Sequence, residues 1–339
     1  MQRFASAKQE PSPTLAARAV FDLIEHELSL VESEFEHQAG SNIQVINYLG
    51  DYLRASGGKR VRPALVILAN YSVGGDAASD KVIRLATVME MLHTATLVHD
   101  DIIDNADTRR NRSSINARFG NQTAVLMGDW LYMSAFETTV AERSLEIIDI
   151  LTRLTRKMTE GELIQLTRIG RLDISESEYF DILRRKTAYL FAAGCEVGAI
   201  LGGASRLQQH ALAAYGMDLG IAFQLSDDIL DLTGDNKKLG KAAGSDLLEG
   251  KLTLPLIYLL KKRPEIRPKL EKIMFDGTYE ALSRESLKSL LVKNGILAEI
   301  RSRAAEHSLS ARKSLDVLPE SEYRSCLEDV LAFVTERNT

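Results

Sequence analysis

Residues 64–254 contain no proline, and this feature most constrains how the chain can fold. The whole sequence of 339 residues has seven prolines. At an average usage of about 5%, roughly ten would be expected in this stretch alone. Proline breaks the hydrogen-bond ladder of a helix and clashes with the preceding turn. A long interior without proline therefore predicts helix after helix, and no linker divides it into domains.

Apolar residues at helical spacing, with glycine or proline at the boundaries, locate the helices. The predicted spans are about 20–35, 42–55, 63–71, 80–104, 121–142, 145–168, 176–200 and 207–233, with weaker helices after Pro255. Residues 234–252, rich in glycine and lysine, predict an ordered loop, and no segment shows the alternation of a strand. The predicted fold class is all-α, with a single domain over residues 14–339. Residues 1–13 are polar, contain two prolines and are predicted to be disordered.

Composition and charge exclude several classes of protein. Hydrophobic residues make up 45% of the chain and charged residues 26%, which excludes an intrinsically disordered protein. A net charge of −5 argues against general nucleic-acid binding. No stretch reaches the ~18 apolar residues of a membrane span, and the N-terminus lacks the apolar core of a secretory signal. Cys195 and Cys326 are too few for a disulfide framework, so we expect a cytoplasmic protein.

Two aspartate clusters close long predicted helices. The first comprises Asp100, Asp101 and Asp104, and the second comprises Asp227, Asp228 and Asp231. In each, the first and last carboxylates share one helix face, where like charges repel and oppose the helix dipole. A solvated acidic helix end would explain one such cluster but explains two with apolar flanks poorly. The repetition predicts bound cations, and oxygen ligands beside a phosphate-bearing substrate favour Mg²⁺.

Basic residues accompany both clusters. Arg109 and Arg110 follow the first, and Lys237, Lys238, Lys241 and Lys251 follow the second. Upstream, GGKRVRP (57–63) places a glycine turn and three cations at a helix N-terminus, an arrangement that binds anions. The lysines alone are better explained as a solvated face, whereas the glycines and Pro63 fix the geometry of the upstream segment. Metal-binding carboxylates with cations on either side predict a diphosphate or polyphosphate substrate.

These motifs resemble those of a known family, the trans-polyprenyl diphosphate synthases, over about residues 40–260. The resemblance is carried by GGKRVRP (57–63), HTATLVHDDIIDNADTRR (93–110), NARFGNQTAVLMGDWL (116–131), KTA (186–188), FQLSDDILD (223–231) and LGKAAGSDLLEGKLTLP (239–255). It implies a helical bundle of the isoprenoid synthase type with a central cavity. It also implies a Mg²⁺-dependent prenyltransferase that acts as a homodimer and makes a long, octaprenyl-like product for a quinone side chain. One departure is Asn111, where the family usually has glycine, which could alter the local turn.

The resemblance also implies a mechanism and a set of site residues. In the family, three Mg²⁺ ions held between the clusters grip an allylic diphosphate such as farnesyl diphosphate and help the diphosphate leave. The double bond of isopentenyl diphosphate attacks the allylic cation, and loss of a proton completes a head-to-tail condensation that repeats. By resemblance the six aspartates bind the metal, and Lys59, Arg62, His93 and Arg110 bind isopentenyl diphosphate. The positions that hold the allylic diphosphate and its metals match Arg109, Lys186, Thr187, Gln224, Lys241 and Lys251, with Asp246 a candidate to hold a metal-bound water.

Helical spacing supports two of these assignments. His93 lies seven residues before Asp100, and Gln224 lies three residues before Asp227, so each falls on the face of its aspartates. A lone histidine is more often a hydrogen-bonded structural residue, but its place on the aspartate stripe favours a ligand role. The sequence shows no Ser/His/Asp or Cys/His arrangement, and the mechanism of the family needs none.

The growing product is predicted to run beside the helix of the first cluster. Thr96 lies one turn before Asp100, next to Ala95, and Leu92 lies a further turn away. Short-chain relatives carry bulky aromatics at the positions of Ala95 and Thr96, so small residues there imply a tunnel that continues. Each isoprene unit spans ~5 Å, about one helical turn. Candidates for the tunnel floor are Tyr132, Met133 and Phe136, which fit plain core packing equally well.

Three alternatives are weighed against this interpretation. A class I terpene cyclase shares the fold, but normally has an Asn/Ser/Glu-type second motif and lacks the GGKR segment. A regulatory subunit of a heteromeric synthase loses the aspartates, whereas all six are present here. An acidic helical scaffold leaves Lys59, Arg62 and Lys186 unexplained. The expected partners are the two diphosphate substrates, a second copy of the chain and, at most, a transient membrane contact during product release.

Overall fold

The computed structural model describes residues 19–55, 57–109, 112–234 and 243–336. Its α-helices are α2 (Glu25–Ala39), α3 (Gln44–Arg54), α4 (Val61–Ser72), α5 (Asp80–Ile103), α6 (Ile115–Phe119), α7 (Asn121–Ala141), α8 (Leu145–Leu166), α9 (Glu176–Leu183), α10 (Tyr189–Leu201), α11 (Arg206–Thr233), α13 (Ser245–Leu248), α14 (Leu254–Lys262), α15 (Arg267–Asp276), α16 (Arg284–Lys293), α17 (Ile296–Ser314) and α18 (Glu322–Glu336). A π-helical turn, η1 (Arg184–Ala188), joins α9 to α10, and short 3-10 turns are η2 (Pro264–Ile266) and η3 (Leu315–Val317). Two strands of two residues each, β1 (Thr108–Arg109) and β2 (Arg112–Ser113), pair antiparallel. The predicted all-α fold class is confirmed, although the sequence analysis expected no strand.

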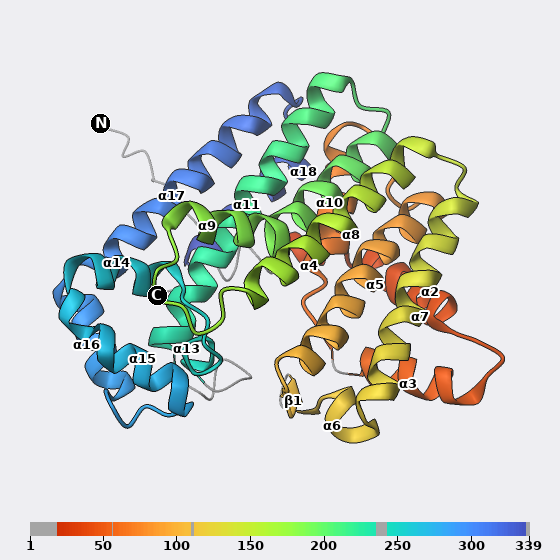
Figure 1. Cartoon of the computed structure of the whole chain (residues 1–339). Coiled ribbons are helices and arrows are strands. Elements are labelled where there is room, and N and C mark those ends of the chain that lie inside the picture. The colour runs from red at the N-terminus through yellow and green to blue at the C-terminus, as the bar shows by residue number, and fades with distance from the viewer. Residues whose placement is uncertain (1–18, 56, 110–111, 235–242, 337–339) are drawn as a thin grey trace, which may run out of the picture.

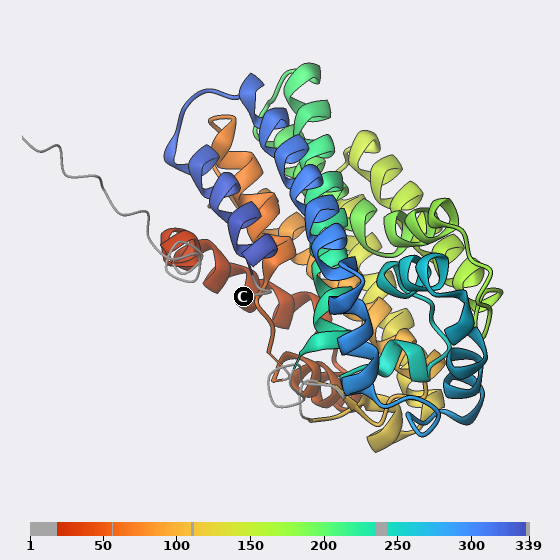
Figure 2. The same cartoon turned by 90° about the vertical axis from the view of Figure 1, so that its left-hand side faces the viewer.

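The long helices pack side by side around the centre of the molecule (Figure 1). Helix α10 lies between α4 and α11, and α5 packs against both α4 and α7. Helix α17 runs along α11, as the turned view shows (Figure 2), while α13 to α16 gather beside the C-terminal part of α11. Helices that are distant in the sequence thus enclose a common interior.

Two clusters of buried apolar residues form the core. The larger cluster is built mainly by α4, α5, α7, α8 and α10, and the smaller one by α14 to α17 and their neighbours. Helix α11 contributes to both, with Leu219 in the first cluster and Leu225 in the second. Burial of such surface stabilises the fold by about 25 cal/mol per Å². A single domain over 14–339 stays a prediction, as does the disorder of residues 1–13, which lie outside the described part of the chain.

Two helices and one loop differ slightly from their predicted bounds. The first amphipathic helix was predicted over about 20–35, and α2 spans Glu25–Ala39. Helix α4 begins at Val61 rather than at Pro63, which occupies its first turn. Proline is tolerated there because the first amide groups of a helix have no intrahelical acceptor. The predicted loop after α11 contains the one-turn helix α13, which follows Gly244 in the left-handed region at φ 80°.

The predicted helix over 176–200 is interrupted by the π-helical turn η1. Such turns insert an extra residue into a helix and often occur at functional sites. Two glycines allow neighbouring helices to approach it closely. A Cβ atom on Gly161 of α8 would lie 2.7 Å from the Cβ of Arg185, and one on Gly220 of α11 would lie 2.6 Å from the Cα of Ala188. The turn is therefore clamped between α8 and α11.

Within the described residues, no helix is both long and apolar enough to cross a lipid bilayer.

We predict that Gly220→Ala destabilises the protein by about 1–3 kcal/mol, because the new methyl group meets backbone that cannot move aside freely. Chemical denaturation measures the change. The matched control is Gly50→Ala in α3, where the added Cβ makes an ordinary contact of 3.8 Å with Ala39. That variant should be neutral or stabilised by up to about 1 kcal/mol, since alanine favours a helix. Equal stability of the two variants would contradict the clamp on η1.

Candidate active site

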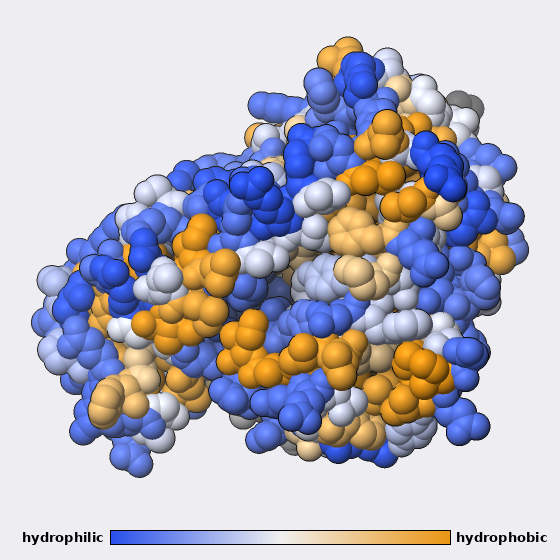
Figure 3. Space-filling view, turned by 45° about the vertical axis from the view of Figure 1, so that its right-hand side comes forward, coloured by the Kyte–Doolittle hydropathy of each residue, from blue (hydrophilic) through white to orange (hydrophobic). Residues whose placement is uncertain are grey.

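A cavity of about 810 Å³ opens between α5, α8, α11, η1 and the segment around α13. Among the described residues, seven carboxylates and five Lys or Arg side chains line it. The acidic residues are Asp100, Asp104, Asp129, Glu162, Asp227, Asp228 and Asp246, and the basic ones are Arg62, Arg109, Arg168, Lys186 and Lys251. Figure 3 shows a hollow with apolar groups beside it, and the exposed side chains of Ile103, Leu163, Leu166 and Ile169 belong to its lining. The cavity is therefore charged on one part of its wall and apolar on another.

The first aspartate cluster divides between two environments. Asp100 and Asp104 line the cavity, as their helical spacing predicted. Asp101 is buried and turned away, and its Oδ1 accepts a hydrogen bond of 2.7 Å from Nε of Arg109. The resemblance assigned all three carboxylates to the metal, but the offset of the second residue places it on the adjacent helix face. Arg109 itself reaches the cavity wall from β1.

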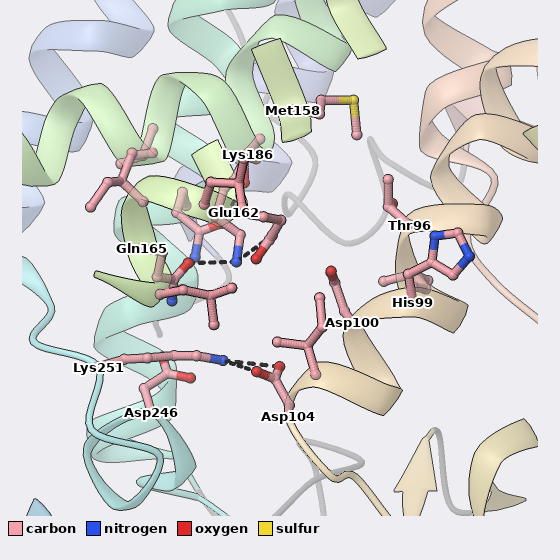
Figure 4. Close-up of a pocket in the computed structure, with 18 of the residues that line it drawn as sticks. Thr96, His99, Asp100, Asp104, Met158, Glu162, Gln165, Lys186, Asp246 and Lys251 are labelled. Carbon is pink, nitrogen blue, oxygen red and sulfur yellow. Dashed lines mark hydrogen bonds and ion pairs between the residues drawn. The ribbon is translucent and has the colours of Figure 1, made fainter. Parts of the chain in front are cut away.

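Lys251 bridges the cavity to the first cluster. Its Nζ lies 2.9 Å from both carboxylate oxygens of Asp104 and 2.7 Å from Oε2 of Glu249. Figure 4 shows this pair crossing from the segment after α13 to the end of α5, with Asp246 beside the lysine. Burial lowers the pKa of Lys251, but the two carboxylates outweigh it and the net shift is upward. Lys251 therefore stays charged and ready to bind an anion.

The second cluster belongs to a hydrogen-bonded chain that reaches η1. Asp227 and Asp228 line the cavity. The hydroxyl of Tyr179 donates to Oδ2 of Asp228 at 2.5 Å, and Nε2 of Gln224 donates to its Oδ1 at 3.0 Å. Oγ1 of Thr187 in turn donates to Oε1 of Gln224 at 2.9 Å. The predicted proximity of Gln224, Thr187 and the aspartates is thus present, and Tyr179 is an additional partner that the sequence analysis did not identify.

Asp231 lies behind the cavity rather than on its wall. Its side chain is buried, and its Oδ1 accepts a hydrogen bond of 3.4 Å from Oγ of Ser245. Its backbone carbonyl accepts a hydrogen bond of 2.7 Å from the amide of Gly244. Asp231 therefore ties the end of α11 to the start of α13.

Helix α8 supplies two polar side chains that the sequence analysis missed. Oε1 of Glu162 lies 2.6 Å from Nζ of Lys186, which also donates to Oε1 of Gln165. All three line the cavity, and Figure 4 shows them facing Asp100 and Asp104 from the opposite wall. The signal in the sequence was a polar i, i+3 pair inside an otherwise apolar stripe, which by itself marks no particular chemistry.

Burial and repulsion raise the pKa of two cavity carboxyls. Asp100 lines the cavity, and desolvation together with the charge of Glu162 raises its pKa to about 7. Desolvation and the charge of Asp246 raise the pKa of Asp228 to about 8. In both cases loss of solvation is the larger cause, and the neighbouring carboxylate adds to it. The described lining also holds seven carboxylates against five Lys or Arg side chains, an excess of negative charge. A bound divalent cation would relieve this excess.

Only some of the residues expected to bind isopentenyl diphosphate line the cavity. Arg62 and His93 line the cavity, and the guanidinium of Arg62 lies 5.1 Å from the centre of the Phe191 ring. Lys59 is exposed and does not line it, and its Nζ lies 4.9 Å from the ring centre of Phe333 in α18. Arg110, Asn111 and Lys241, which the resemblance singled out, lie outside the described residues.

Likewise, only some of the candidate tunnel residues line the cavity. Thr96 and Tyr132 line the cavity, together with His99, whose ring stacks on that of Tyr132. Leu92 and Ala95 are fully buried and Phe136 is half-buried, and all three pack in the core without lining the cavity. Met133 is 62% exposed on the outer face of α7, so it cannot form the floor within one chain. The helix was predicted correctly, but periodicity did not distinguish its inner face from its outer one.

The donor set fits Mg²⁺, because the cavity offers carboxylate oxygens next to cations for phosphate. Among the described residues, no group of three or more His, Cys, Asp or Glu is placed to hold a metal ion. Mg²⁺ in proteins is usually coordinated by one or two carboxylates, waters and substrate phosphates. Asp100, Asp104, Asp227 and Asp228 are the residues that would hold it.

An all-α bundle around a cavity of this kind is characteristic of isoprenoid synthases, and comparison with known proteins agrees. The sequence pattern of the family described as "Polyprenyl synthetase" matches residues 43–290. Octaprenyl diphosphate synthase of Haemophilus influenzae is 36% identical over 318 residues, which is 93% of this chain and 95% of that protein. A short chain isoprenyl diphosphate synthase of Methanothermobacter thermautotrophicus is also 36% identical, over 85% of this chain and 89% of its own length.

A solved structure shows the same architecture. The polyprenyl synthase of Caulobacter crescentus, crystallised with calcium and isoprenyl diphosphate, aligns with a TM-score of 0.90 and 34% identity. The alignment covers 98% of this chain and 100% of that one. The chain therefore belongs to the polyprenyl synthetase family, and it is a prenyltransferase.

We predict that the stability of the metal-free protein falls as the pH rises from 5 to 9. The pKa of Asp228 is about 8 in the folded protein but about 4 in an unfolded chain. Between these values the folded state binds more protons, so its stability decreases as the pH increases. The unfolding temperature measured with a chelator should drop by several degrees.

Asp228→Asn removes one of the two groups that titrate in this range and should reduce the slope to the part that Asp100 contributes. Asp276→Asn, at an exposed position on α15, is the matched control and should leave the slope unchanged. A wild-type slope in the Asp228 variant would show that this carboxyl does not titrate in the stated range.

Proposed function

We propose that the protein is a long-chain trans-polyprenyl diphosphate synthase. It would condense isopentenyl diphosphate repeatedly, head to tail, onto an allylic diphosphate such as farnesyl diphosphate. The observation that carries the proposal is the facing of two aspartate clusters across a cavity that also presents Lys186, Lys251 and Arg109. A cyclase would need no second diphosphate site, whereas Arg62 and His93 provide further groups on the same wall.

The charged part of the cavity would bind and orient the allylic diphosphate. Lys186 and Lys251 are held within hydrogen-bond distance of carboxylates, so phosphate oxygens would replace those partners. Bound Mg²⁺ would supply positive charge to the leaving diphosphate when present. Asp100, Asp104, Asp227 and Asp228 would anchor up to three such ions, the number implied by the family resemblance.

The apolar part of the cavity would shield the allylic cation from water. Its lining includes Met158, Leu183 and Phe223. Exclusion of water strengthens electrostatic interactions and prevents hydrolysis of a reactive intermediate. Arg62 and His93, with Lys59 after rearrangement and with Arg110 as the resemblance implies, would place isopentenyl diphosphate against the allylic carbon. The released diphosphate would accept the proton, so no protein base is required.

The product would be long, octaprenyl-like in length, and would supply a quinone side chain in the cytoplasm. Thr96 is small and lines the cavity one turn before Asp100, which leaves space for a growing tail beside α5. Tyr132 is the large residue nearest to this path on α7 that also lines the cavity. The similar proteins include an octaprenyl diphosphate synthase and a short chain isoprenyl diphosphate synthase. Family membership alone therefore does not determine the product length, and an assay of the products is needed.

The expected activity is synthesis of a long polyprenyl diphosphate by the recombinant chain alone. The assay supplies farnesyl diphosphate, labelled isopentenyl diphosphate and Mg²⁺, followed by dephosphorylation and chromatography of the products. Lys186→Ala should reduce the rate on the order of a hundredfold through loss of charge stabilisation, whereas Lys272→Ala, on the exposed side of α15, should not. Cyclic hydrocarbon as the product, or no incorporation by the wild type, would refute the proposal.

Thr96→Tyr should shorten the product, because an aromatic ring there would block the space one turn below Asp100. The same chromatography measures the distribution of chain lengths. Ala95→Phe should act in the same direction but should also destabilise the fold, since Ala95 is fully buried. Lys81→Tyr, at an exposed position of the same helix and not on the cavity wall, is the control. Unchanged product length in Thr96→Tyr would exclude a tunnel along this face of α5.

The outer face of α7 supports the proposed homodimer. Leu126, Met133 and Val140 recur at seven-residue spacing and are 68%, 62% and 47% exposed. Such a stripe would bury against a second copy of itself, as in a twofold interface. Leu126→Glu with Met133→Glu should yield monomers in sedimentation experiments, while Leu309→Glu, at a 55% exposed position on α17, should not. Dimers that survive the double substitution would place the interface elsewhere.

A further inference from the structure

The turn before α4 adopts a backbone conformation that its sequence does not favour. Arg60, the residue that precedes α4, has φ 49° and ψ 36°, in the left-handed region. Residues other than glycine rarely adopt this conformation, and they keep it only where surrounding contacts hold it. The backbone hydrogen bonds of the turn run to Arg54 and Ala64, its neighbours in sequence. Contacts of the Arg60 side chain with other helices therefore bear on how this conformation is held.

The guanidinium of Arg60 is buried between carboxylates from two other helices. Its Nη1 donates to Oε1 of Glu90 on α5 at 2.7 Å. Its Nη2 donates to Oε2 of Glu32 on α2 at 3.1 Å, and its Nε also bonds to Glu32. The side chain of Arg60 is 13% exposed and that of Glu90 is 5% exposed. A buried arginine with two carboxylates is held in a defined geometry, because losing either partner would leave a charge uncompensated.

This ion pair connects two parts of the active site. Glu90 lies three residues before His93 on α5, and Arg60 lies two residues before Arg62. Both Arg62 and His93 line the cavity. The pair thus fixes the segment that carries Lys59 and Arg62 to the helix that carries His93.

We call the ion pair of Arg60 with Glu90 and Glu32 the anchor. It lies directly behind the first aspartate cluster. Arg60 and Glu90 line a small void of about 40 Å³ together with Asp101 and Arg109. No ligand of the size of a diphosphate substrate fits there, and Arg60 does not line the main cavity. Its role is therefore structural support of the site rather than contact with substrate.

We propose that Arg60, held by Glu90 and Glu32, is a positioning residue that sets the geometry of the isopentenyl diphosphate subsite. This inference rests on the proposed function, because that function assigns Lys59, Arg62 and His93 to isopentenyl diphosphate. It predicts a larger effect on isopentenyl diphosphate than on the allylic substrate. The allylic diphosphate subsite includes Lys186 and Thr187 of η1 and Gln224 of α11, and of its residues only Arg109 borders the void that Arg60 and Glu90 line.

Two substitutions test the anchor from both sides. Glu90→Gln removes the buried charge, and Arg60→Gly removes the guanidinium while relieving the left-handed backbone. Both should raise the KM for isopentenyl diphosphate about tenfold, the equivalent of one ordinary charge-assisted hydrogen bond. The KM for farnesyl diphosphate should rise less, by about threefold at most, since only Arg109 of its subsite borders the anchor. Arg60→Lys, which keeps the charge but not the fork, should recover only part of the affinity.

Two control variants separate positioning from general stability. Arg143 is an exposed residue with φ 54°, so Arg143→Gly relieves the same backbone conformation far from the site. Glu142, at the C-terminal end of α7, is 9% exposed and pairs with Arg84 of α5, so Glu142→Gln removes a carboxylate that pairs with the helix of Glu90. Neither control should change the KM for isopentenyl diphosphate, whatever its effect on the unfolding temperature.

The outcomes are distinct. Equal increases in both KM values, or a KM unchanged in the anchor variants while their unfolding temperature falls, would overturn the positioning role. Failure of the wild-type chain to incorporate isopentenyl diphosphate would instead overturn the proposed function.

Discussion

Negative charge buried at the ends of α5 and α11 is the constraint on which the rest of the structure depends. A carboxylate in an apolar interior is costly unless it is protonated or paired. In this protein the pairing is distributed: Arg109 neutralises Asp101, Lys251 neutralises Asp104, and Tyr179 with Gln224 hydrogen-bonds Asp228. Each partner comes from a different element, so the electrostatics of the clusters also hold those elements in place.

This pairing is incomplete, because the described lining of the cavity holds seven carboxylates and five Lys or Arg side chains. The remaining negative charge is what makes the cavity suited to divalent cations, and the cations on its wall are what make it suited to diphosphate. Nζ of Lys186 and Nζ of Lys251 each lie within hydrogen-bond distance of a carboxylate of the protein, which orients both side chains although they are partly buried. The same interactions therefore serve the stability of the fold and the chemistry proposed for the site.

Rigid backbone supports this arrangement from behind. The π-helical turn that presents Lys186 and Thr187 is clamped by Gly161 and Gly220, which bring α8 and α11 closer than any side chain would permit. On the other side of the cavity, the buried pair of Arg60 and Glu90 fastens the segment before α4 to α5. The two supports involve different helices. Binding of the two substrates would thus rely on separate parts of the scaffold.

The sequence by itself determined the helical fold, the two aspartate clusters and most of the cations near them. These features are local: absence of proline, a 3.6-residue period and the i, i+4 spacing of carboxylates depend only on neighbouring residues. The tertiary structure alone decided that Asp101 turns to Arg109 and Asp231 to α13, that Glu162 and Gln165 join Lys186, and that Met133 faces outward. Periodicity identifies the faces of a helix, but which face meets the cavity depends on helices that pack against it from distant parts of the chain. For the same reason neither the break at η1 nor the anchor of Arg60 was visible until α8, α11, α2 and α5 were placed around them.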